Sequence, residues 1–99
     1  MLRHVVLFRW TDAADAAARA AIEVALATLP ARISEISAYR FGADAGLAAG
    51  NWDFAVVADF RDQAAYEVYR DHPAHRAVIA ERIAPFIAER AAVQLALEG

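Results

Sequence analysis

Two segments of this chain alternate with the period of a β-strand and yet are apolar on both faces. In LRHVVLFRW, residues 2–10, His4 lies on one face among apolar neighbours, while Val5 and Leu7 form the centre of the other. The segment DFAVVADF, residues 53–60, repeats this pattern. A strand that is apolar on both sides needs cover on both sides. The sequence therefore predicts a sheet with helices on one face and a further layer, such as a second copy of the chain, on the other.

The first half of the chain contains one helical pattern between two strand patterns. Residues 13–29 carry an apolar stripe at helical spacing, with Thr11 and Asp12 as candidate N-caps. We expect Pro30 to end this helix. Residues 34–42, SEISAYRFG, follow as the second strand.

The second half contains a broken helix and a last strand. Asp62 is a candidate N-cap for a short helix that stops at His72. Pro73 suits the first position of the next helix, which we expect to run to about residue 87. Pro85 should loosen its last turn. The segment ERAAVQLALE, residues 89–98, is expected to be the fourth strand and to turn four apolar side chains inward: Ala91, Val93, Leu95 and Leu97.

The order β-α-β-β-α-α-β predicts an α+β fold of the ferredoxin-like split βαβ type. It has a four-stranded antiparallel sheet with helices on one face. Residues 1–99 are short enough to form a single domain. Because 60% of this short chain is hydrophobic, we expect a second buried surface and therefore a homodimer.

Composition excludes several classes of function. The chain has no cysteine and no lysine, so a thiolate metal site, a cysteine nucleophile and a Schiff-base lysine are excluded. A net charge of −3 argues against nucleic acid as a partner. No signal peptide, membrane span or nucleotide-binding fingerprint is present, so we expect a cytoplasmic protein without a membrane or cofactor partner.

Two of the three histidines flank a Pro-Ala pair at the predicted start of the last helix. His75 shares a helical stripe with Ile79, so its ring should point toward the sheet. The helix N-terminus and burial both disfavour the imidazolium, which predicts a lowered pKa and a neutral ring able to accept a proton. His4, on the first strand, and Tyr69, on the preceding helix, are expected to line the same pocket; Tyr39 is a further candidate.

Two alternatives to a catalytic site stay open. An inward histidine is often a hydrogen-bonded core residue, and His72 would then simply cap the helix. A zinc site is disfavoured, because His72 and His75 lack a third ligand in their apolar surroundings.

The glycine-rich connection over residues 42–51 is either a plain hairpin loop or a mobile flap.

Several segments together resemble the stress-responsive dimeric α/β-barrel (Dabb) domain family over essentially the whole chain. They are LRHVVLFRW, WDFAVVADF and the motif YRDHPAH, which runs from Tyr69 to His75, combined with the early strand histidine His4. The resemblance implies a ferredoxin-like protomer whose sheet pairs with that of a second copy to form a barrel. It also implies a pocket between the sheet and the helices of each protomer.

A plant branch of this family cyclises linear polyketide acids without a metal or organic cofactor. The resemblance carries its acid/base pair to Tyr69 and His75 and its pocket-lining histidine to His4. This chain departs from the plant pattern early in the third strand, where Phe54 replaces a histidine. The pocket should therefore be more apolar, and the same polyketide substrate is not expected.

We therefore expect a protein that binds a small apolar or aromatic ligand between sheet and helices. Cofactor-free acid/base catalysis would use His75 as the base, Tyr69 to stabilise an enolate or phenolate oxygen, and His4 to orient them. One alternative is a non-enzymatic, stress-related binding or structural protein. Another is a cofactor-free monooxygenase or isomerase, which related dimeric barrels resemble.

Overall fold

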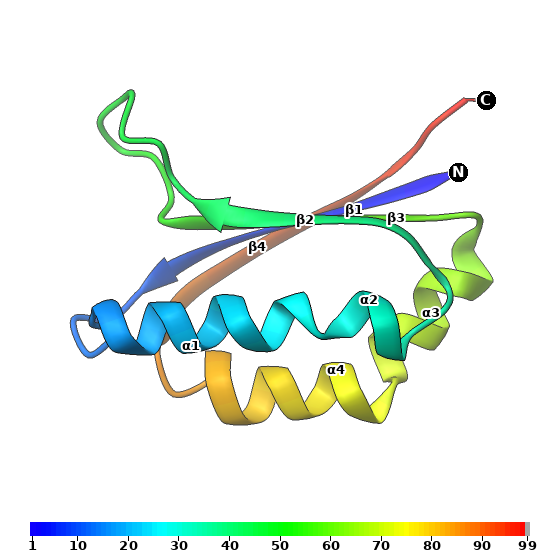
Figure 1. Cartoon of the computed structure of the whole chain (residues 1–99). Coiled ribbons are helices and arrows are strands. Elements are labelled where there is room, and N and C mark those ends of the chain that lie inside the picture. Colours follow the sequence, from blue (N-terminus) through cyan, green and yellow to red (C-terminus); the bar gives the residue numbers. More distant parts are fainter. Residues whose placement is uncertain (99) are drawn as a thin grey trace.

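The computed structural model describes residues 1–98 and has one sheet covered by helices on one face (Figure 1). The strands are β1 (Leu2–Trp10), β2 (Ile36–Ala43), β3 (Phe54–Phe60) and β4 (Ile87–Ala96). They lie in the order β2-β3-β1-β4, and every neighbouring pair is antiparallel. The predicted ferredoxin-like α+β fold is confirmed.

The first helical region differs from the prediction at both ends. Helix α1 (Ala16–Ala27) begins later than expected, because Asp15 and neither Thr11 nor Asp12 is its N-cap; the Asp15 carboxylate accepts a hydrogen bond from the Ala18 amide at 2.8 Å. The expectation that Pro30 ends the helix is also wrong. Pro30 lies in the first turn of α2 (Leu29–Arg32), where its missing N–H costs no hydrogen bond.

The second helical region is broken where the sequence predicts. Helix α3 (Gln63–Asp71) is capped by Asp62, and α4 (Pro73–Val78) begins at the proline, with His72 as its N-cap. The last helix then widens into a π-helical turn, η1 (Ile79–Ile83). The Ala84 amide donates to the Ile79 carbonyl at 2.7 Å, which ends the helix just before Pro85.

The hydrophobic core lies between the sheet and these helices. Successive strand residues point to opposite faces, and β1 and β3 turn their bulkier apolar residues toward the helices. The core is formed by buried side chains from both layers: Val6, Phe8, Ile22, Leu26, Leu29, Ile33, Phe54, Val56, Phe60 and Ile83. This packing fixes the height of the helices above the sheet and so leaves the space described below.

One prediction about β4 is wrong. The residues expected to point inward, Val93 and Leu95 among them, lie on the face away from the helices and are about half exposed in the protomer. The pairing register decides this, because Gln94 lies opposite the buried His4 and Arg90 lies opposite the buried Phe8. Residues opposite each other in an antiparallel pair share a face. The helix side of β4 is therefore more polar than expected.

The face of the sheet away from the helices has an apolar centre and a charged end. Val5 lies between Val57 on β3 and Val93 on β4. At the end of the face, the Arg3 guanidinium donates two hydrogen bonds to the Asp59 carboxylate, at 2.7 and 3.0 Å. This pair lowers the pKa of Asp59, chiefly through the hydrogen bond. Arg3 therefore keeps the Asp59 carboxylate charged and paired at neutral pH.

Among residues 1–98, no helix has the length and apolarity that crossing a membrane requires.

Candidate functional site

A cavity of about 200 Å³ lies between the sheet and the helices. Its apolar walls come from β1, β3, α1 and η1, and its polar groups come from β1, β4, α3 and α4. The residues that line it are His4, Val6, Phe8, Leu26, Val56, Tyr66, Tyr69, Arg70, His75, Ile79 and Arg90. The three residues expected to share a pocket, His4, Tyr69 and His75, are thus brought together from three separate elements.

The His75 ring is held in one tautomer by the end of the preceding helix. Its Nδ1 lies 3.1 Å from the Arg70 carbonyl oxygen. Because a carbonyl oxygen only accepts, Nδ1 must carry the proton. Burial lowers the pKa of His75, although the backbone hydrogen bond opposes this shift. In the neutral ring Nε2 is then an acceptor that receives no hydrogen bond from residues 1–98, as a general base requires.

The Tyr69 hydroxyl belongs to a buried pair. Tyr69 is only 3% exposed, and its hydroxyl oxygen lies 3.0 Å from that of Tyr39 on β2. Burial first, and then the neighbouring Tyr39, raise the pKa of Tyr69, so the hydroxyl stays protonated. The Tyr69 and His75 rings are in contact, with centroids 4.1 Å apart. The geometry therefore places a protonated donor beside a neutral acceptor.

His4 is buried on β1 and is also held in one tautomer. The Gln94 amide nitrogen on β4 lies 2.8 Å from Nδ1 of His4. With the amide as the donor, Nδ1 accepts, and Nε2 then carries the proton of the neutral ring. Burial, followed by the charge of Arg90 and the neighbouring His75, lowers the pKa of His4 to about 4. His4 is therefore a neutral hydrogen-bond donor in the pocket wall at pH 7.

Sequence reasoning missed Arg70 on α3 and two residues of β4. Gln94 and Arg90 lie on the side of β4 that was expected to face away from the helices. The sequence contains a signal that these residues belong together. Arg90, Ala92 and Gln94 are spaced two positions apart and therefore share one face of the strand. Phe54, which replaces the histidine of the plant pattern, packs against Phe8 and does not line the cavity.

Within residues 1–98, no three histidine or acidic side chains gather closely enough to hold a metal ion.

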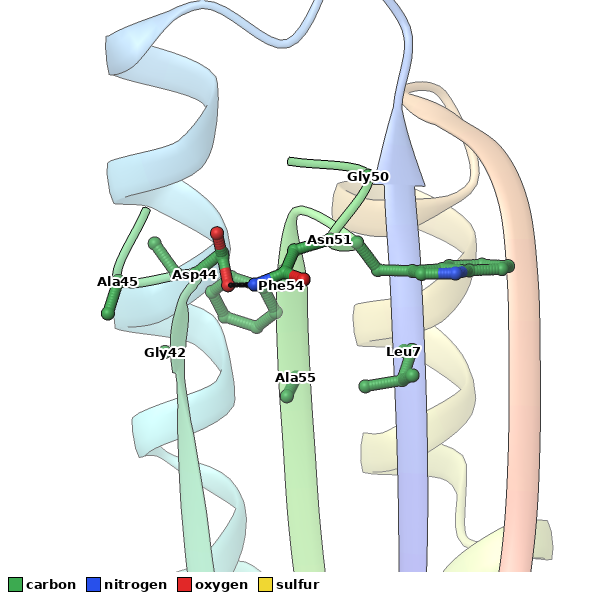
Figure 2. Close-up of a pocket in the computed structure, with 10 residues that line it drawn as sticks. Leu7, Gly42, Asp44, Ala45, Gly50, Asn51, Phe54 and Ala55 are labelled. Atoms are coloured by element: carbon green, nitrogen blue, oxygen red, sulfur yellow. Dashed lines mark hydrogen bonds between the residues drawn. The ribbon is translucent and has the colours of Figure 1, made fainter. Parts of the chain in front are cut away.

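A second cavity, of about 470 Å³, lies on the other face of the sheet (Figure 2). There the β2–β3 connection rises away from the helices (Figure 1). Leu7 and Ala55 project into the cavity from β1 and β3, and the Asn51 amide donates to the Asp44 carboxylate across the connection at 3.1 Å (Figure 2). Among residues 1–98, no histidine or tyrosine lines this cavity. Its one titratable lining group is Asp44, whose carboxylate already accepts hydrogen bonds from Asn51 and from the Gly46 amide.

Comparisons with known proteins agree with this architecture. Residues 2–96 match the family described as the stress responsive A/B barrel domain. A solved structure from Thermobifida fusca, described as a dimeric ferredoxin-like protein of unknown function, is 52% identical; it matches 97% of this chain and 90% of its own with a TM-score of 0.90.

Two further solved structures are more distant. A dimeric protein of unknown function from Bacteroides fragilis is 26% identical, with a TM-score of 0.81 over 97% of this chain and 95% of its own. A Dabb family protein from Mesorhizobium loti is 23% identical, with a TM-score of 0.82 over 99% and 97%. No curated protein matches the sequence.

Proposed function

The chain belongs to the stress responsive A/B barrel domain family, and from this premise we propose that it is a homodimer that binds a small apolar or aromatic ligand between sheet and helices. We further propose that residues 1–99 form one domain and that the pocket catalyses proton transfer without a cofactor. A cytoplasmic location stays a prediction.

One observation supports this proposal most directly: several polar side chains converge on a cavity whose other walls are apolar. Ligand sites are typically apolar clefts with a few well-placed polar groups. Here the apolar floor is formed by sheet residues such as Val6, Phe8 and Val56, and the polar groups include His4, Tyr69 and His75. The volume of about 200 Å³ suits a single ring, since a cavity of roughly 150 Å³ is known to hold benzene.

The proposed chemistry follows from the protonation states. Nε2 of His75 accepts a proton from the carbon next to a carbonyl group of the ligand. The protonated Tyr69–Tyr39 pair donates to the enolate oxygen that forms, and Nε2–H of His4 holds the ligand in place. Proton exchange at that carbon is the simplest reaction of this class.

The second candidate function, a non-enzymatic binding or structural protein, is favoured by one observation. Nδ1 of His75 donates to the Arg70 carbonyl, so the ring also ties α4 to the end of α3. A purely structural His75 would be required for stability and not for chemistry.

The substitution His75→Ala separates these functions. The assay is deuterium incorporation from D₂O into the methyl group of acetophenone, followed by proton NMR at neutral pH. We expect the rate to fall by about 100-fold or more, the usual share of a general base. The melting temperature should change little, because His75 is only half-buried. Replacing a buried residue such as Ile83 by alanine should instead lower the free energy of unfolding by about 2–5 kcal/mol.

His72→Ala is the matched control for this test. His72 caps α4 through a hydrogen bond from the Ala74 amide to Nδ1 at 3.0 Å and does not line the cavity. Its loss should cost about 1 kcal/mol of stability and leave the exchange rate unchanged. Exchange by the wild type no faster than in buffer would refute the enzymatic proposal. A His75→Ala variant as unstable as Ile83→Ala would support the structural one.

The homodimer is supported by the sheet face that the helices leave bare. Val5, Leu7, Val57 and Val93 give this face an apolar centre. The structure from Thermobifida fusca, at 52% identity, is described as dimeric. In a two-fold dimer the same patch lies on both sides of the interface. The second cavity opens on this face, so a partner would restrict it, while the smaller cavity lies under the helices.

A further inference from the structure

The charged side chains that line the smaller cavity are all of one sign. Two arginines line it, Arg70 at the end of α3 and Arg90 on β4, and among residues 1–98 no aspartate or glutamate does. Both arginines are exposed, whereas the apolar floor and His4 are buried. A chain with a net charge of −3 therefore places a cationic rim on an apolar pocket.

The two arginines differ in whether their charge is already paired. The Arg70 guanidinium donates two hydrogen bonds to the Asp71 carboxylate, both at 2.9 Å. Arg90 forms no ion pair and no side-chain hydrogen bond with any residue from 1 to 98. Its guanidinium keeps all of its donors for another partner.

Arg90 is also close to the groups proposed to handle protons. It lies opposite Phe8 in the β1–β4 ladder, on the face that points to the helices, and so stands above the floor of the cavity. Burial is the main cause of the lowered pKa of His4 and of His75, and the positive charge of Arg90 contributes to both. A negative group bound to Arg90 would therefore offset the positive charge that acts on both imidazoles.

We propose that the ligand of this pocket is a small aromatic carboxylic acid, bound with its ring over the apolar floor and its carboxylate on Arg90. This inference rests on the proposed function and adds the charge and class of the ligand. A guanidinium matches a carboxylate in geometry and can donate two parallel hydrogen bonds to it. The cationic rim disfavours amines of the same size.

The test compares benzoate with benzamide, which has nearly the same shape and no charge. Dissociation constants are measured by NMR titration of the wild-type protein at pH 7.5 and low salt. We expect benzoate to bind at least about tenfold more tightly, as a hydrogen-bonded ion pair would give. The variant Arg90→Gln should lose this preference and keep its affinity for benzamide. Arg82→Gln, which removes the same charge from an exposed position on η1, should behave as the wild type.

The outcomes distinguish this inference from the proposed function. If benzamide binds as well as benzoate, or if Arg90→Gln keeps the preference, the carboxylate assignment is wrong and the ligand pocket stands. If inorganic phosphate displaces benzoate at equal concentration, the rim is a simple anion site and the aromatic acid is wrong. If neither ring compound binds, both the inference and the proposed function fail.

Discussion

The substitution Val5→Asp is expected to convert the proposed homodimer into folded monomers. Val5 lies at the centre of the bare sheet face, between Val57 and Val93, with no cation directly opposite it. Two-fold symmetry would bury two unpaired carboxylates, each costing about 3 kcal/mol or more. About 6 kcal/mol corresponds to a dissociation constant raised roughly 10,000-fold. Sedimentation equilibrium at micromolar concentration measures this change.

The control for this experiment is Val24→Asp. Val24 is 70% exposed on α1, on the helical side of the molecule, so the same change in charge and size should leave the dimer intact. Circular dichroism of both variants checks that the protomer remains folded. Equal dimer masses for Val5→Asp and Val24→Asp would show that the bare face is not the interface.

Stability is expected to fall as the pH is lowered from about 6.5 to about 4, and His4 should cause a large share of the loss. Its pKa is lowered from 6.5 to about 4 in the folded chain, chiefly by burial and then by the charge of Arg90. Above pH 6.5 the ring is neutral in both states and imposes no penalty. Between the two pKa values the unfolded chain binds the proton and the folded chain does not, so unfolding is favoured. The resulting loss in the free energy of unfolding amounts to about 3 kcal/mol at pH 4.

The variant His4→Gln tests this assignment. Glutamine keeps a polar group opposite Gln94 and cannot be protonated in this range. The free energy of unfolding, measured with urea at pH 7.5 and pH 4, should fall by about 3 kcal/mol less in the variant than in the wild type. The carboxylates titrate in both proteins, so their contribution to the fall in stability cancels when the two proteins are compared. The same fall in both proteins would mean that His4 is not the buried neutral group described above.

Much of the fold could be predicted because local patterns and caps agree with the tertiary structure. The doubly apolar strands required two covering layers, and the break at His72 and Pro73 followed from the backbone preferences of proline. The helix after Thr11 was placed too early, since several residues in that stretch could cap it and only the packed helix selects Asp15. Such choices depend on contacts that a local pattern does not contain.

The face of β4 could not be predicted for a more general reason. Alternation shows which residues share a face, but not which face meets the helices. In a sheet buried on both sides, the apolar set can belong to either layer. The pairing register with β1 resolves this, placing Gln94 opposite His4 and Arg90 opposite Phe8. The sequence therefore predicted that His4, Tyr69 and His75 share one pocket, while the contributions of β4 to that pocket became visible only in the folded chain.

The most direct test of the account is to locate a bound ring by intermolecular nuclear Overhauser effects. With acetophenone bound to the isotope-labelled protein, we predict effects from its ring and methyl protons to the aromatic protons of His75 and Tyr69. Effects confined to Leu7 and Ala55, on the opposite face of the sheet, would contradict the account, and so would the absence of any effect at saturating ligand.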